Sequence, residues 1–187
     1  MKFNINTVIL VGGALILGGV VYGLQIKSPS ESNNNGSLVK QEDRLFPFNR
    51  EDITEITINK QSQTLNFVKS SGENSIWEMT QPEKIKANDA SMSFLLNLFP
   101  EATKQPQIEV TEKLLSDYGL ESAPSTLTVK INNGDNYEIK LGNSNFDDTK
   151  VYGLVKFPNS GEENIFLLSK SFVYAIDRDL SEWQDNQ

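Results

Sequence analysis

An uncharged apolar run near the amino terminus, TVILVGGALILGGVVYGL, spans 18 residues from Thr7 to Leu24. At about 1.5 Å per residue, a helix of this length covers about 27 Å, close to the roughly 30 Å hydrocarbon core of a bilayer. The run therefore predicts one N-terminal transmembrane helix, with residues 1–27 as a membrane anchor. A cleaved signal peptide is the alternative, and its best cleavage site, at Val21 to Gly23, departs from the small-x-small pattern.

The residues assigned to the membrane are Thr7, Val8, Gly12, Gly19, Gly23 and Leu24. Gly19 and Gly23 have the spacing that lets two transmembrane helices approach closely, although glycine is also common in spans without a helix partner. Lys2 and Lys27 flank the run and orient it weakly. A long acidic domain behind such an anchor is most simply placed outside the cytoplasm, so we expect a single-pass membrane protein.

The chain after the anchor is strongly acidic. All 25 Asp and Glu residues follow Lys27, where 15 Lys and Arg residues remain, which leaves this part with a net charge of −10. Nucleic-acid binding needs a basic face to neutralise phosphates, so it is not expected, and an anionic membrane surface is disfavoured for the same reason. The sequence also contains no Cys and no His, the commonest thiolate, general-base and zinc-binding side chains. We therefore expect no enzyme, no cofactor and no metal site.

Polar composition separates the anchor from the rest. The stretch SPSESNNNGS, residues 28–37, offers no apolar side chain larger than proline. Such a segment cannot offset its ordering entropy, so residues 28–44 are predicted to be a flexible polar linker. Residues 45–187 then form a single extracytoplasmic domain.

Alternation of apolar and polar residues predicts strands in several places. A hairpin is expected from Ile53–Asn59 and Thr64–Lys69, with a third strand at Ser75–Thr80. Residues 125–131 and 136–142 flank Asn133-Gly134, which is typical of a primed two-residue turn. A further strand pair is expected at residues 150–157 and 164–169.

Three segments have helical spacing. Met92, Leu95, Leu96 and Phe99 predict a helix capped by Asn88 or Asp89 and closed by Pro100. Thr111–Leu120 predicts a short helix that ends in a glycine C-cap at Gly119. A last helix is expected from about Ser171 to Leu180. The fold class is α+β: an antiparallel sheet built from hairpins, with two to three short helices packed on it.

Candidate sites have plainer explanations. Asn143, Asn145, Asp147 and Asp148 offer oxygen ligands for calcium, but the EF-hand glycine and closing Glu are missing, which favours a solvated loop. Ser169, Lys170 and Ser171 resemble a Ser/Lys nucleophile, yet helix capping explains both serines. Glu162 and Glu163 are adjacent in sequence, so spacing does not place them as the facing carboxylates of a glycosidase.

Aromatic side chains leave two interpretations open. They are Trp77, Phe94, Phe99, Tyr118, Tyr152 and Phe166. Core packing is the default interpretation, and a groove for an apolar or peptide ligand is the alternative. Exposed aromatics such as Trp183 or Tyr152 would suit a small molecule or a glycan.

Several stretches in order resemble a bacterial family called domain of unknown function 4340. They are LFPFNREDITEITI, IWEMTQPEKIKAND, DYGLESAPSTLTV, YEIKLGN, VYGLV, IFLLS and FVYAIDRDL, which together run from about Leu45 to Leu180. The residues that mark the resemblance most clearly are Trp77, Pro82, Tyr118, Gly119, Leu120, Pro124, Leu141 and Gly142. We call these the family marks.

The resemblance implies a membrane-anchored, extracytoplasmic module without established catalytic residues, which in some genomes is encoded beside gliding-type ABC transporter components. We therefore expect a non-enzymatic accessory protein in a bacterial membrane, with its C-terminal domain on the periplasmic or luminal side and membrane protein complex subunits as partners. An extracytoplasmic small-molecule or glycan-binding module is the alternative.

Overall fold

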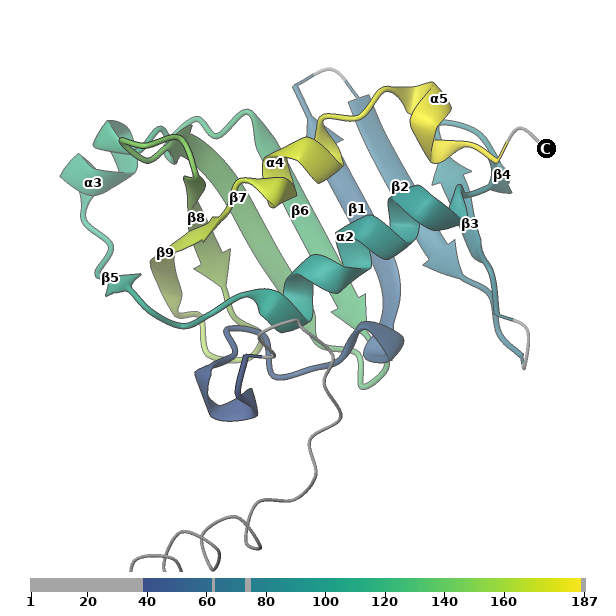
Figure 1. Ribbon diagram of the computed structural model, residues 1–187, viewed down its shortest axis with the longest axis horizontal. Coiled ribbons are helices and arrows are strands. Elements are labelled where there is room, and N and C mark those ends of the chain that lie inside the picture. The colour runs from purple at the N-terminus through teal and green to yellow at the C-terminus, as the bar shows by residue number, and fades with distance from the viewer. Residues whose placement is uncertain (1–38, 62, 73–74, 186–187) are drawn as a thin grey trace, which may run out of the picture. The chain divides into compact units, whose positions relative to one another are not determined.

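The computed structural model describes residues 39–61, 63–72 and 75–185, and within them one antiparallel sheet dominates (Figure 1). Its strand order is β4-β3-β2-β1-β6-β7-β8-β9-β5. The strands are β1 (Ile53–Lys60), β2 (Gln63–Lys69), β3 (Trp77–Gln81), β4 (Ile85–Lys86), β5 (Gln107–Ile108), β6 (Ser125–Ile131), β7 (Asn136–Ser144), β8 (Lys150–Lys156) and β9 (Glu163–Ser169). The helices are α2 (Asp89–Glu101), α3 (Glu112–Asp117), α4 (Ser171–Ile176) and α5 (Leu180–Trp183), with 3₁₀ turns η1 (Gln41–Asp43) and η2 (Arg50–Asp52).

The predicted α+β class is confirmed: a few short helices accompany an antiparallel sheet. The predicted anchor, residues 1–27, lies outside the described residues. Within residues 39–185 as described, no helix is long and apolar enough to span a bilayer.

The first hairpin forms as its alternation predicts. Ile56 of β1 lies opposite Phe67 of β2, and both side chains are fully buried. The second hairpin, β6 and β7, also forms, but its predicted two-residue primed turn is wrong. A primed type I turn needs positive φ at both central residues, whereas of Asn133 and Gly134 only Gly134 has it, at 91°. Instead Gly134 donates to the carbonyl of Ile131, whose own N–H donates to Asp135, which is a three-residue loop closed by a left-handed glycine.

Helix α2 forms on the predicted apolar face and is capped by Asn88. The Asn88 side chain accepts from the backbone N–H groups of Ala90 and Ser91 at 3.1 and 3.0 Å. The helix does not stop before Pro100 but continues to Glu101.

The single helix predicted from about Ser171 to Leu180 is instead two helices, α4 and α5. Between them Asp179 begins a new helix with a capping box, in which its backbone N–H donates to Glu182 at 2.9 Å. Capping strength at Asp179 therefore outweighs the apolar spacing that suggested one continuous helix.

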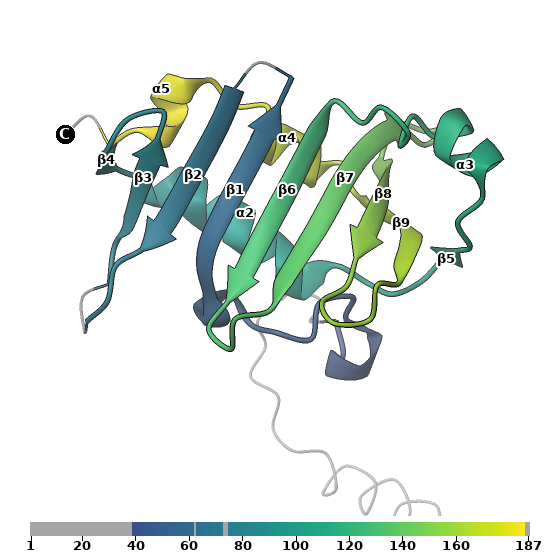
Figure 2. The same ribbon diagram turned by 180° about the vertical axis from the view of Figure 1, so that it is seen from behind.

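Two four-stranded meanders make up almost the whole sheet. β1 to β4 are followed by α2, and β6 to β9 are followed by α4, with the two meanders joined by the antiparallel pair β1 and β6. Helices α2, α4 and α5 lie together on one face of the sheet, and Figure 2 shows the opposite face of β1, β2, β3, β6 and β7 without helices. The main core fills the space between helices and sheet. A smaller core around Leu120, Leu154 and Ile165 lies where α3 and β5 pack near β8 and β9.

Candidate functional site

Two family marks that are distant in sequence contact each other at the end of α3. Gly119 has φ +67°, and its N–H donates to the carbonyl of Ser116. The N–H of Leu120 donates to the carbonyl of Leu115 at 2.8 Å, which completes a Schellman motif. The predicted glycine C-cap is therefore confirmed, and Leu120 is directed into the smaller core.

Gly142 of β7 lies against the C-terminal end of α3. The N–H of Asn143 donates to the carbonyl of Tyr118 at 2.7 Å, and a Cβ on Gly142 would lie only 2.2 Å from that same oxygen. A Cβ on Gly119 would lie 2.6 Å from the Asn143 side chain. Both glycines are thus required by close approach between α3 and β7.

The contact also places two aromatic rings. Tyr118 stacks on Tyr152 of β8 with ring centroids 3.7 Å apart and ring planes 4° apart. Burial, and then the neighbouring Tyr118, raise the pKa of the Tyr152 phenol. Two further marks lie far from this contact. Trp77 is buried in β3, Pro82 follows β3, and three strands, β2, β1 and β6, separate β3 from β7 in the sheet. The marks Tyr118, Gly119, Leu120 and Gly142 therefore form a structural contact between α3 and β7, which we call the joint.

The face of β1, β2, β6 and β7 opposite α2 and α4 is lined by polar side chains, and we call it the polar face. Alternate residues of four strands form it: Glu55, Thr57 and Asn59 on β1, Thr64, Asn66 and Val68 on β2, Thr126, Thr128 and Lys130 on β6, and Asn136, Glu138 and Lys140 on β7. All but Val68 are polar or charged. The strand register sets them in rows, one of which runs from Asn66 through Thr57 and Thr128 to Glu138.

Hydrogen bonds hold part of the polar face in place. The Asn66 amide donates to Glu55 and to the Thr57 hydroxyl, both at 2.9 Å. The Thr80 hydroxyl of β3 donates to the side-chain oxygen Oδ1 of Asn66. Lys130 lies 3.9 Å from Glu55. These side chains therefore present donors and acceptors in fixed positions rather than as mobile chains.

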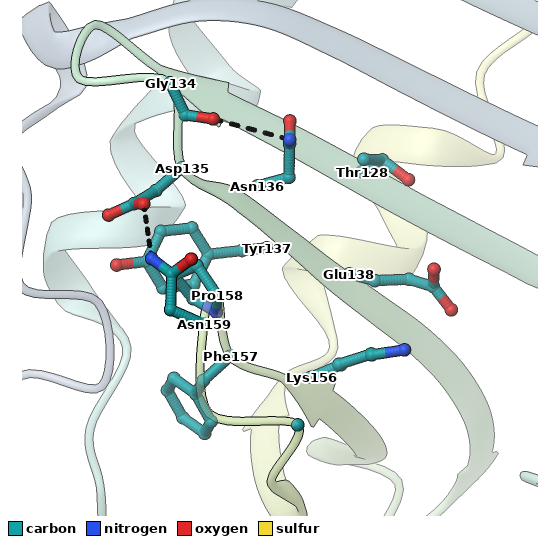
Figure 3. Close-up of a pocket in the computed structure, with 11 residues that line it drawn as sticks. Thr128, Gly134, Asp135, Asn136, Tyr137, Glu138, Lys156, Phe157, Pro158 and Asn159 are labelled. Atoms are coloured by element: carbon teal, nitrogen blue, oxygen red, sulfur yellow. Dashed lines mark hydrogen bonds between the residues drawn. The ribbon is translucent and has the colours of Figure 1, made fainter.

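A cavity of about 330 Å³ lies at one end of the polar face, between the β6–β7 turn and the β8–β9 turn (Figure 3). Thr128, Glu138 and Lys156 reach it from the strands, and Asp135 and Asn159 reach it from the two turns. Asn159 donates to Asp135 at 2.9 Å and so links the turns. Lys156 is paired through its backbone in β8, but its ammonium group makes no hydrogen bond or ion pair with another described residue.

Sequence reasoning did not find this cavity. The turn signals NNGD and PNSG place Asp135 and Asn159 in loops, but strand order alone brings those loops together. The cavity combines carboxylate, amide, hydroxyl and ammonium groups, a mixture suited to a hydroxyl-rich ligand rather than to a metal ion. Within the described residues, no group of three or more acidic side chains is placed to hold a metal.

Of the four residues that suggested calcium, Asn143 belongs to β7 and contacts the end of α3, and the other three hold the loop between β7 and β8 in place. Asn145 Oδ1 accepts from the backbone of Thr149 and Lys150 at 3.1 and 2.9 Å, and Asp147 Oδ1 accepts from the backbone and hydroxyl of Thr149. Asp148 forms an ion pair with Lys170.

The Ser/Lys candidate is likewise engaged. Lys170 pairs with Asp148, and Ser169 Oγ accepts from the N–H of Ser171 at 3.2 Å where α4 begins. Glu162 lies in the β8–β9 turn and Glu163 begins β9. None of these groups is positioned as a nucleophile beside a base.

Aromatic residues follow the core interpretation, with exceptions. Phe99 and Phe166 are buried, whereas Phe94 is 37% exposed beneath the Arg178 guanidinium. The expectation that Trp183 is exposed is wrong: its exposed fraction is 0%, and its ring lies 4.8 Å from that of Phe67. The restart of the helix at Asp179 turns Trp183 toward the sheet.

Comparison with known proteins gives one match. A family model described as Domain of unknown function (DUF4340) matches residues 77–187, from β3 through the last helix. No curated protein and no solved structure matches the chain. Because the match covers more than half of the sequence and includes the joint between Tyr118 and Gly142, the chain belongs to the DUF4340 family.

Proposed function

We propose that this protein is a membrane-tethered, non-enzymatic accessory protein whose polar face binds a subunit of a membrane assembly. Residues 1–27 anchor it, and residues 45–187 act outside the cytoplasm. An ABC-type transport assembly is the partner that the family resemblance favours. The observation that carries the proposal is the polar face, the sheet surface opposite α2 and α4 (Figure 2). The strand register sets its polar side chains in rows.

The polar face suits a partner in a non-obligate complex, one that binds and dissociates. Interfaces of non-obligate complexes are about as polar as the rest of a protein surface, and they carry many direct hydrogen bonds. Side chains already fixed, such as Asn66 between Glu55 and Thr57, lose little conformational freedom on binding. The absence of His and Cys from the sequence, and the engagement of Lys170 and Asp148 with each other, support a role without catalysis.

A photo-crosslinking amino acid tests the polar face directly. Placed at Thr128, at the centre of this face, it is expected to form one discrete protein adduct in native membranes. The matched control is the same amino acid at Phe94 of α2, on the helix-covered side, where we expect no such adduct. Adducts in the tagged, full-length protein are then purified in mild detergent and identified by mass spectrometry.

Two results would contradict the proposal. One is the same adduct pattern at positions 128 and 94. The other is complete function and complex formation after deletion of residues 1–27, since the anchor would then have no role. Release of the protein without detergent, beginning near Leu24, would show that the first segment is a removed signal.

The cavity in Figure 3 favours a second candidate function, binding of a small hydroxyl-rich molecule such as a saccharide. A ligand that binds only the folded state stabilises it by about 2.7 kcal/mol at a concentration a hundred times Kd. We expect such a compound in a saccharide panel to raise Tm of the wild-type chain but not of Lys156→Ala. The Lys156 ammonium group has no partner among the described residues, so its removal should leave the ligand-free Tm unchanged. A Tm rise of equal size in both proteins would exclude the cavity.

A further inference from the structure

The loop between β7 and β8 presents a fully exposed aromatic side chain. Phe146 is 100% exposed, whereas the other large exposed apolar side chains of the described residues are between 36% and 60% exposed. It contributes nothing to either core. Apolar side chains scattered on a surface need no explanation, but this one stands in a loop that several hydrogen bonds close.

Hydrogen bonds close the loop on both sides of Phe146. The N–H of Asn145 donates to the carbonyl of Lys150 at 2.9 Å, and the Asn145 side chain accepts from Thr149 and Lys150. On the other side, Asp147 accepts twice from Thr149. These hydrogen bonds restrain the backbone on both sides of Phe146.

An ion pair ties the same loop to the helical side of the domain. Asp148, at φ 59°, pairs with Lys170 at the start of α4. A side chain on a fixed support loses little entropy on docking, and this is the property that lets one aromatic residue dominate an interface. The full exposure of Phe146 and the hydrogen-bonded loop that carries it therefore both favour a role in recognition.

Charge restricts what Phe146 contacts. The Thr149 hydroxyl and backbone hold the pKa of Asp147 below its ordinary value, and Lys170 does the same for Asp148. Both carboxylates are therefore negative at neutral pH. Because the chain after the anchor also carries a net charge of −10, an anionic lipid surface would be repelled. A protein surface with Lys or Arg around an apolar pocket would be attracted.

We propose that Phe146 is the aromatic anchor of a docking site for a protein partner, inserting into an apolar pocket bordered by basic residues. The inference rests on the proposed function, because it names a second point of contact with the same membrane assembly. Phe146 supplies the buried contact, and Asp147 supplies the charge that orients the encounter.

The test uses the full-length protein in native membranes with the photo-crosslinking amino acid at position 146, and again at position 94 as the control. The expected adduct joins position 146 to partner residues that lie among apolar side chains next to Lys or Arg. Affinity is then measured with that purified partner. Phe146→Ser is expected to weaken binding ten- to a hundredfold, and Phe146→Leu less.

Asp147→Asn separates charge from loop structure, because the amide keeps an oxygen that can accept from Thr149. We expect several-fold weaker binding at low salt and little difference at high salt. Both Phe146→Ser and Asp147→Asn should melt at the wild-type Tm, since Phe146 lies outside the cores and the loop acceptor is retained.

The outcomes separate the inference from the proposed function. An adduct at position 128 but none at 146, or unchanged affinity of Phe146→Ser, overturns the role of Phe146 and leaves the accessory role standing. A lipid adduct at position 146 also overturns it. Absence of protein adducts at both 128 and 146 overturns both proposals.

Discussion

Replacement of Trp183 by alanine is expected to lower the free energy of unfolding by about 3–5 kcal/mol, the cost of removing a buried Trp side chain. Trp183 is fully buried, and its ring packs on Phe67 of β2. A loss of this size is a large share of the 5–15 kcal/mol typical of a folded domain.

The loss of stability should extend beyond the space that the Trp183 side chain leaves. Trp183 belongs to a C-terminal segment, residues 182–185, that we call the clasp. The Trp183 carbonyl accepts from the N–H of Asn88 at 2.8 Å, and Ser91 donates to the Glu182 carbonyl at 2.7 Å. Lys86 of β4 forms an ion pair with Asp185 at 2.6 Å. Loosening this clasp removes support from the start of α2 and from the short strand β4 together.

Urea unfolding of the full chain in mild detergent, followed by far-UV circular dichroism, measures the change. Tyr174→Ala is the matched control, because Tyr174 is 60% exposed and its loss should change stability by less than about 0.5 kcal/mol. Hydrogen exchange of α2 should also accelerate in Trp183→Ala. Equal stabilities of the two variants would contradict the burial of Trp183 and the existence of the clasp.

The second large effect is expected from Gly142→Ala, which should destabilise the protein by about 2–4 kcal/mol. The added Cβ would lie 2.2 Å from the Tyr118 carbonyl oxygen and 3.0 Å from the Leu120 side chain. Overpacking costs about 1–3 kcal/mol, and loss of the hydrogen bond from Asn143 to Tyr118 adds about 0.5–1.5 kcal/mol. Backbone cannot yield as a side-chain end can, so α3 must move away from β7.

Gly153→Ala is the control for this prediction. Its Cβ would lie 2.5 Å from Cδ1 of Leu168, a side-chain atom rather than a backbone atom, so a shift of the buried Leu168 side chain can relieve part of the overlap. We expect Gly142→Ala to be the less stable variant and to show faster hydrogen exchange at residues 112–120, with the β1–β2 hairpin unaffected. A Gly142→Ala protein no less stable than Gly153→Ala would show that the joint between α3 and β7 tolerates separation.

Local patterns predicted most of the strands and helices of this DUF4340 protein. Alternation in residues 53–69 specified the β1–β2 hairpin, because one face of each strand is buried. The helix caps at Asn88 and Gly119 could also be predicted from the sequence, because capping depends on the adjacent backbone. At Asp179 and at Asn133-Gly134 two local signals compete, and there the predicted single helix and the predicted primed turn are wrong.

Features that depend on contacts between distant segments were not readable. Which sheet face the helices cover, and hence which residues form the polar face, is set by packing of α2 on α4 and by the clasp at Trp183. The cavity beside Asp135 and Asn159 is formed by the β6–β7 turn and the β8–β9 turn, which are separated in the sequence by the strands β7 and β8. The rigidity of the Phe146 loop required the ion pair of Asp148 with a lysine 22 residues later.

The pairing of β1 with β6 joins the two meanders into one sheet. Thr57 lies opposite Thr128, and Ile56 and Ile58 on one side match Leu127 and Val129 on the other. Each meander is followed by a helix on the same face of the sheet, α2 after β4 and α4 after β9, and these two helices contact each other. Because both meanders belong to one chain, the pairing of β1 with β6 is intramolecular, and dilution of the protein cannot separate them as it separates the subunits of a dimer.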